Sequence, residues 1–194
     1  MRGFLVFLGL LLSAPALAAD ERGSWYIGVG GGKTTFRDVC GAAEMMSPGN
    51  TCDDEANGFK AFVGYDFSKW YGLELAVADV GEAELIAPAT NPGTLKINSR
   101  LASLSGTLNV PFGNRFALLG KVGLTYYKVD YDRTGSFTAL NSGDDGLEPS
   151  IGAGFTVNFT NNFALRAEWE NFNDAGGLGD GNIETVTASL LLRF

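Results

Sequence analysis

The segment Glu184–Phe194, ETVTASLLLRF, alternates between two kinds of side chain. One face is apolar and ends on an aromatic ring; it comprises Val186, Ala188, Leu190, Leu192 and Phe194. The other face comprises Thr185, Thr187, Ser189, Leu191 and Arg193. A period of two residues predicts a β-strand. An apolar face that ends on a phenylalanine is expected of a strand that meets the boundary of a lipid bilayer.

Seven earlier segments show the same period, and turn-forming residues separate them. They begin near Trp25, Phe59, Tyr71, Ala102, Leu118, Ile151 and Phe163. Apolar residues alternate there with small or polar ones, which is the pattern of strands that cross a membrane in a barrel. No apolar run after the N-terminal region reaches the ~20 residues of a spanning helix. The sequence therefore predicts an all-β fold, an eight-stranded antiparallel up-and-down transmembrane β-barrel.

The predicted connections alternate in length. Residues 68–70, 111–115 and 160–162 form short turns, and residues 37–57, 79–96, 132–147 and 171–182 form long loops. Short periplasmic turns and long outer loops are typical of bacterial outer-membrane barrels. Aromatic rings favour the headgroup level, and they gather at the short-turn end as a predicted girdle. The girdle residues are Trp25, Trp70, Tyr71, Phe112, Phe116, Phe159, Phe163 and Phe194. The alternative is a soluble barrel whose apolar face points inward.

The N-terminal region has the pattern of a secretory signal peptide. Arg2 precedes a short apolar core, and Ala16-Leu17-Ala18 forms an A-x-A cleavage site. We therefore predict a signal peptide at residues 1–18 and a barrel domain at residues 19–194, with an uncleaved anchor helix as the alternative. Export places Cys40 and Cys52 in an oxidising compartment, which predicts a disulfide; two free thiols are the alternative.

Composition excludes several kinds of chemistry. The formal net charge of −8 argues against nucleic acid as a partner. The sequence contains no histidine, so Ser-His catalysis is excluded and a zinc centre is disfavoured. The predicted long loops carry acidic clusters: Asp53-Asp54-Glu55, Glu82 with Glu84, Asp144-Asp145, and Asp174 with Asp180. We interpret these as a solvated surface, with calcium binding as the alternative. We expect no metal centre and no cofactor.

Four stretches indicate a family: Phe116–Asp130 (FALLGKVGLTYYKVD), Leu147–Gly154 (LEPSIGAG), Phe163–Trp169 (FALRAEW) and the terminal SLLLRF. In order and spacing they resemble the transmembrane domain of the outer membrane protein A family and related eight-stranded porin-like proteins. The resemblance implies a place in the outer membrane of a Gram-negative bacterium and contact with its lipid and lipopolysaccharide. It also implies recognition of the strand ending in Phe194 by the barrel assembly machinery. Larger members carry a periplasmic peptidoglycan-binding domain after the barrel; this sequence stops at the eighth strand, so we do not expect that activity.

Charged residues also occupy the polar faces of the predicted strands. Glu74, Lys121 and Arg166 each lie four or five residues from a short turn, so they should lie at similar depth inside the barrel. Isolated interior charges are costly and should pair. The resemblance implies an interior salt-bridge network at Glu74, Lys121, Arg166 and Glu168, with Lys60 and Glu170 as further candidates. We interpret it as a polar plug; a gate in a narrow pore is the alternative. Thr156 and Asn158 stand where a switching acid would be needed, which argues against the gate.

The predicted function is that of a small integral outer-membrane protein with a structural or surface-interaction role. Its interior is plugged, and its outer loops are available to an extracellular ligand. A narrow, low-conductance channel for ions or small solutes is the second hypothesis. An outer-membrane enzyme is the third, and the missing histidine disfavours it.

Overall fold

The computed structural model describes residues 23–37, 40, 51–87, 93–135, 143–173 and 181–194. The predicted signal peptide at residues 1–18 lies outside these ranges. The described residues include no helix that is long and apolar enough to span a bilayer.

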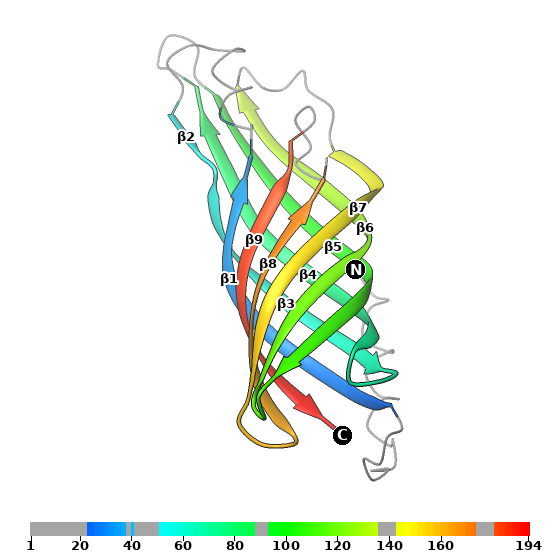
Figure 1. The fold of residues 1–194 in the computed structure, drawn as a ribbon. Coiled ribbons are helices and arrows are strands. Elements are labelled where there is room, and N and C mark those ends of the chain that lie inside the picture. The colour runs from blue at the N-terminus through cyan, green and yellow to red at the C-terminus, as the bar shows by residue number, and fades with distance from the viewer. Residues whose placement is uncertain (1–22, 38–39, 41–50, 88–92, 136–142, 174–180) are drawn as a thin grey trace.

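The strands wrap into one closed antiparallel sheet (Figure 1). They are β1 Ser24–Phe36, β2 Thr51–Asp53, β3 Glu55–Asp66, β4 Tyr71–Ile86, β5 Gly93–Phe112, β6 Phe116–Gly135, β7 Gly143–Asn158, β8 Phe163–Phe172 and β9 Ile183–Arg193. Each long strand pairs with its neighbours in the chain, and β1 pairs with β9 to close the circle. The three-residue β2 precedes β3 and pairs with the far end of β4. The predicted eight-stranded up-and-down barrel is therefore confirmed. The short strand β2 is an addition at the outer end of β4.

Tight turns join the strands at one end of the barrel, which we call the short-turn end. Ser68 Oγ accepts hydrogen bonds from the backbone N–H groups of Trp70 and Tyr71. Thr160 Oγ1 accepts equivalent bonds from Asn162 and Phe163. Such hydroxyl groups stabilise a local turn because they replace backbone acceptors. The residues predicted as short turns thus carry the turn chemistry themselves.

At the opposite end, which we call the long-loop end, the loops are shorter than the sequence predicted. The predicted loop 79–96 is mostly strand, because β4 runs to Ile86 and β5 begins at Gly93. Most of the predicted loop 132–147 also belongs to β6 and β7. In the other two predicted loops, β2 and the start of β3 lie within 37–57, and β8 extends to Phe172. The strands therefore extend well beyond the segments that the apolar alternation marked.

A β-bulge between Asp79 and Glu82 explains why the prediction ended β4 too early. Gly81 has a positive φ of 83°, and a Cβ there would come within 2.6 Å of the Asn57 carbonyl oxygen. Asp79 Oδ1 accepts a hydrogen bond from the Gly81 N–H at 3.1 Å. The extra residue shifts the period-two pattern by one position. The sequence alternation is interrupted there although the strand continues.

Candidate functional site

Glu74 lies at the centre of a charged network inside the barrel. Its Oε1 accepts a hydrogen bond from Lys121 Nζ at 2.7 Å, and its Oε2 accepts one from Arg166 Nη1 at 2.6 Å. The Tyr26 hydroxyl also donates to Oε2, at 3.0 Å. β1, β4, β6 and β8 contribute these four side chains, so the network links strands around the whole circumference.

Two further carboxylates and a second lysine extend the network toward the long-loop end. Lys121 Nζ contacts Glu168 Oε1 at 3.3 Å and Glu170 Oε1 at 2.7 Å. Lys60 Nζ contacts the other oxygens of the same acids, at 3.1 Å and 2.6 Å. Each of these two carboxylates therefore bridges two ammonium groups.

Aromatic rings line the same space. The Arg166 guanidinium lies 5.2 Å from the Tyr26 ring centroid and 5.1 Å from that of Phe62. Lys60 Nζ lies 5.3 Å from the Phe62 ring. At these distances a cation is attracted to the ring face. The rings fill the volume between the charges and help to orient them.

The network is buried and balanced in charge. The side chains of Glu74, Lys121 and Arg166 are at most 3% exposed. Three carboxylates face three cations: Glu74, Glu168 and Glu170 against Lys60, Lys121 and Arg166. Removing ions from water costs several kcal/mol per ion, so these groups are tolerated because each has several partners. The arrangement fixes the strands against one another and leaves no net charge for a solute to compensate.

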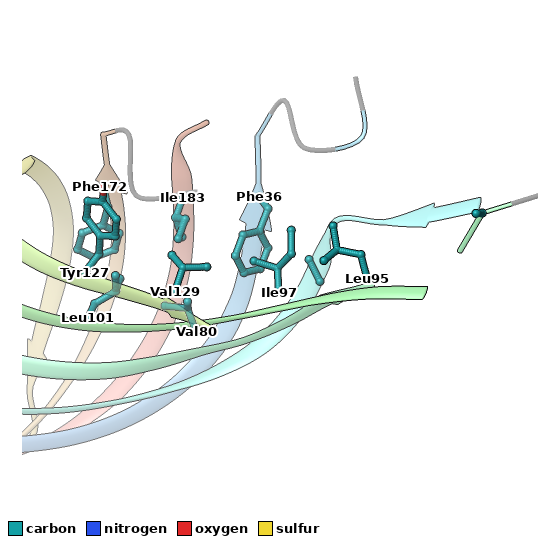
Figure 2. Close-up of a cluster of buried hydrophobic side chains, with 11 residues drawn as sticks. Phe36, Val80, Leu95, Ile97, Leu101, Tyr127, Val129, Phe172 and Ile183 are labelled. Atoms are coloured by element: carbon teal, nitrogen blue, oxygen red, sulfur yellow. The ribbon is translucent and has the colours of Figure 1, made fainter. Parts of the chain in front are cut away.

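A second layer, which we call the apolar layer, fills the barrel on the long-loop side of the network (Figure 2). Its buried residues are Phe36, Val80, Ala83, Ala87, Leu95, Ile97, Leu101, Tyr127, Val129, Phe172 and Ile183. Burial beside this layer raises the pKa of Tyr131 to about 12. A pocket of about 10 Å³ lies between the network and the apolar layer, with Lys60, Glu170 and Phe172 among its lining residues. That is roughly the room of one water molecule.

The short-turn end is open by contrast. A cavity of about 370 Å³ lies there, lined in part by Asp66, Asn109, Asn158 and Arg193. Asn109 Nδ2 donates to Asp66 Oδ1 at 3.4 Å, and Arg193 donates to Asn158. None of the six network charges lines this cavity. The described lumen is therefore hollow at one end, charged in the middle and apolar above.

The structure brings together all four residues that the sequence singled out for the interior: Glu74, Lys121, Arg166 and Glu168. Lys60 and Glu170 complete the network. Thr156 is buried on β7 and supplies no charge. The apolar layer was not predicted from the sequence. Its signal is the alternation in Leu95-Lys96-Ile97-Asn98, which falls partly within the predicted loop 79–96.

The other predicted residues are placed as follows. The eight girdle aromatics are all exposed and lie near the short-turn end, where the rings of Phe112 and Phe116 stack at 5.7 Å. Cys40 and Cys52 form a disulfide, as predicted. Of the acidic clusters, Glu82 pairs with Lys96 at 2.6 Å. Asp174 and Asp180 lie outside the described residues.

These features define a class. Exposed apolar side chains form a belt around the barrel, which we call the apolar belt; it includes Val77, Leu104, Val122 and Leu190. Such a belt, a girdle of aromatic rings and a closed, polar interior characterise an integral outer-membrane β-barrel. The chain belongs to the outer membrane protein beta-barrel domain family, whose match covers residues 4–194. The protein therefore resides in the outer membrane of a Gram-negative bacterium, as predicted. Barrels of this class have their short turns on the periplasmic side.

The chain is similar to proteins of known sequence and structure. The chain is 27% identical over 175 residues to outer membrane protein A of Serratia marcescens, covering 84% of this chain and 47% of the relative. It thus spans about half the length of that curated protein. Among solved structures, Ail of Yersinia pestis, determined with the heparin analogue sucrose octasulfate, has a TM-score of 0.59 at 17% identity, covering 89% of this chain and 99% of that one. The N-terminal barrel of Pseudomonas aeruginosa OprF has a TM-score of 0.56 at 16% identity, covering 90% and 100%. At these identities the two structures show the fold alone.

Proposed function

We propose that this protein is a closed outer-membrane barrel that acts through its outer surface rather than as a pore. The observation that carries the proposal is the stacking of two barriers in series, the charged network and the apolar layer. Eight strands leave an interior that side chains can fill. The pocket between the two barriers that Lys60, Glu170 and Phe172 help to line has a volume of about 10 Å³. Water that enters the cavity at the short-turn end therefore meets the charged network first and the apolar layer second.

The strands at the long-loop end form a rigid surface, which favours a role in binding an extracellular partner. β5 and β6 extend past the apolar belt as a continuous hairpin, paired as far as Gly93 and Gly135. Cross-strand ion pairs reinforce the outer ends, among them Lys33 with Glu55 and Lys96 with Glu82. Binding residues tend to lie on segments that a rigid scaffold positions. Exposed carboxylates at the long-loop end, among them Asp53, Asp144 and Asp145, favour a cationic partner.

We also propose that the protein is not an enzyme. The sequence has no histidine for general-base catalysis. The interior carboxylates that resemble an acid pair, Glu168 and Glu170, both bind Lys60 and Lys121. Groups held in this way stabilise the barrel and have no access to a substrate.

A narrow channel is the second candidate function. The observation that favours it is the redundancy of the network, since Lys121 lies within 3.3 Å of three carboxylates. Such a lysine has alternative partners if one acid moves. The apolar layer lies above it and must also open before ions can pass.

Planar-bilayer recording tests the two barriers separately. Lys121→Ala weakens the charged network, and a Leu95→Ala/Ile97→Ala double variant weakens the apolar layer. If the barriers act in series, wild type and each of these variants conduct little, and combining the three substitutions gives a frequent conductance. Folding of every variant is checked by its gel mobility with and without boiling. A large, steady conductance of the wild type would replace the proposal with the channel function.

A further inference from the structure

The cavity at the short-turn end carries two charges of opposite sign. Asp66 of β3 and Arg193 of β9 both line it, and β1 lies between their strands. Its volume of about 370 Å³ is within the usual range of small-molecule sites, about 300–1,000 Å³. The six charges of the network are not among its lining residues. A solute that enters from this end therefore meets Asp66 and Arg193 first.

Each of the two charges is held by an asparagine that lies two strands away. Asn109 Nδ2 of β5 donates to Asp66 Oδ1 at 3.4 Å, across β4. Gly72 of β4 leaves room for this contact, because a Cβ there would lie 2.7 Å from Asp66 Oδ1. On the other side, Arg193 donates to Asn158 of β7, across β8. The carboxylate is therefore held toward β5 and the guanidinium toward β7, with β6 between them.

Asp66 and Arg193 do not neutralise each other directly. In the part of the chain that the structure describes, neither side chain takes part in an ion pair, and each makes one side-chain hydrogen bond. Lys121 in the network, by contrast, contacts three carboxylates. A carboxylate can accept about four hydrogen bonds, and a guanidinium can donate several. Most of the hydrogen-bonding capacity of Asp66 and Arg193 is therefore available to an occupant of the cavity.

The next layer toward the network also contains polar groups without partners. Thr107 and Thr156 lie two residues deeper than Asn109 and Asn158 on the same strands. Both threonines are buried, and neither hydroxyl has a hydrogen-bond partner among the described residues. Buried polar groups are normally hydrogen-bonded. This layer therefore favours a polar occupant of the cavity over an apolar one.

We propose that the cavity binds a zwitterionic solute of about dipeptide size, with its ammonium group at Asp66 and its carboxylate at Arg193. Hydrogen bonds between charged partners are stronger than those between neutral ones, and a guanidinium fits a carboxylate with two parallel bonds. A ligand with a single charge leaves the other residue unpaired. The site lies inside the barrel wall, so the acyl chains of a lipid keep its headgroup out. The inference does not depend on whether the barrel conducts.

The first test varies the ligand and leaves the protein unchanged. Calorimetric titration of the whole protein in phosphatidylcholine nanodiscs compares alanyl-alanine, its N-acetyl derivative, which lacks the ammonium group, and its amide, which lacks the carboxylate. Each derivative should bind about tenfold more weakly than alanyl-alanine or worse, which corresponds to about 1.4 kcal/mol or more. Alanyl-alanine should also shift the NMR signals of the Asn109 and Asn158 side-chain amides. Equal binding of all three compounds, or no binding of alanyl-alanine, would overturn the proposal.

The second test assigns each ligand group to its residue. Asp66→Asn should weaken binding of alanyl-alanine about tenfold and leave binding of the N-acetyl derivative unchanged. Arg193→Gln should weaken binding of alanyl-alanine to a similar extent and leave binding of the amide unchanged. The matched controls, Glu55→Gln and Lys33→Gln, remove the same charges at the long-loop end and should have no effect. Gel mobility with and without boiling checks folding. Equal losses in the controls would show a general charge effect and refute the site.

Discussion

The barrel has a half inside the membrane, which we call the membrane half, and a half toward the long-loop end, which we call the outer half. The two halves carry their apolar side chains on opposite faces of the sheet. In the membrane half of β5, Leu104 and Leu108 face outward, and Ser103, Ser105 and Thr107 face inward. In the outer half of the same strand, Lys96, Asn98 and Arg100 face outward, and Leu95, Ile97 and Leu101 face inward. The strand geometry is continuous, so the surroundings decide which face is apolar. Lipid requires an apolar exterior, whereas water favours an apolar interior.

This difference determines what stabilises each half. In the membrane half, the interior is stabilised by ion pairs and hydrogen bonds between strands. In the outer half, the interior is stabilised by burial of side chains such as Phe36 and Ile97, each contributing about 1.5–3 kcal/mol. Substitutions should therefore have effects that depend on the half in which they are made.

The largest expected effect is in the charged network. Arg166→Met should destabilise the barrel by about 3–5 kcal/mol, because it leaves Glu74 and Glu168 buried with one cation fewer. Urea unfolding in lipid vesicles measures the change. The control, Lys128→Met at the exposed rim, should change the unfolding free energy by less than about 0.5 kcal/mol. Equal stability of Arg166→Met and wild type would mean that the network does not stabilise the membrane half.

In the apolar layer, Ile97→Ala should cost about 2–5 kcal/mol through lost burial and a cavity. The loss should appear as faster hydrogen exchange in the outer ends of β4 and β5, while the membrane half stays protected. Asn98→Ala, at the neighbouring outward position, is the control and should leave exchange unchanged. Uniform exchange of both halves in Ile97→Ala would contradict the division into two layers.

On the outward face of the barrel, the cost of introducing an arginine should depend on its height. Val122 is 68% exposed on the lipid face of β6, so Val122→Arg should cost about 2–4 kcal/mol near the bilayer midplane. Asn98→Arg, on the outward face of the outer half, should be neutral within about 0.5 kcal/mol. Refolding yield and urea unfolding in vesicles compare the two. Similar costs at both sites would refute the assigned position of the membrane.

Reducing the Cys40–Cys52 disulfide should have a local effect. In the chain-entropy model, a bridge across this separation of 12 residues stabilises the closed segment by roughly 3 kcal/mol, because it lowers the conformational entropy of the unfolded segment. Its loss should release the pairing of β2 with Leu85 and Ile86 of β4, and leave the barrel strands intact. Hydrogen exchange with and without reductant measures the protection of the β2–β4 pairing and of the barrel strands. Global unfolding on reduction would show that the barrel depends on the bridge.

The smallest expected effect is a pH dependence at the outer end of β9. The hydrogen bond from Arg37 at 2.8 Å holds the pKa of Glu184 below its usual range. Since the pKa is lower in the folded protein than in the unfolded chain, where it is about 4.3, the pair stabilises this edge above that pH. The stabilisation is lost as pH falls through the folded pKa. Protection factors of the Thr35 and Glu184 amides should therefore fall on acidification in wild type and remain flat in Glu184→Gln. A pH response retained in the variant would assign the effect to another group.

The periodic segments were sufficient to predict the fold because side chains alternate strictly across a strand. Leu190 and Ser189 were assigned to the outer and inner faces correctly, at 64% and 1% exposure. The depth of Glu74, Lys121 and Arg166 followed from counting residues from the short turns, which begin their strands at one membrane boundary. These inferences needed only local geometry and one assumption about the surroundings.

The outer half could not be predicted in the same way. From Leu101 toward the long-loop end of β5, the apolar side chains face inward instead of outward. At Gly81 in β4, a bulge shifts the period-two alternation by one residue. The pattern that marks a membrane strand is therefore lost in both strands. The joint binding of Glu168 and Glu170 by Lys60 and Lys121 also depends on barrel closure, which brings β3, β6 and β8 within reach of one another. The sequence alone determined the barrel class, the strand faces and the membrane boundary at the short turns, because these depend on alternation within a strand. The tertiary structure decided the length of the outer strands, the apolar layer and the partners of each charge, because these depend on contacts between strands that are distant in the chain.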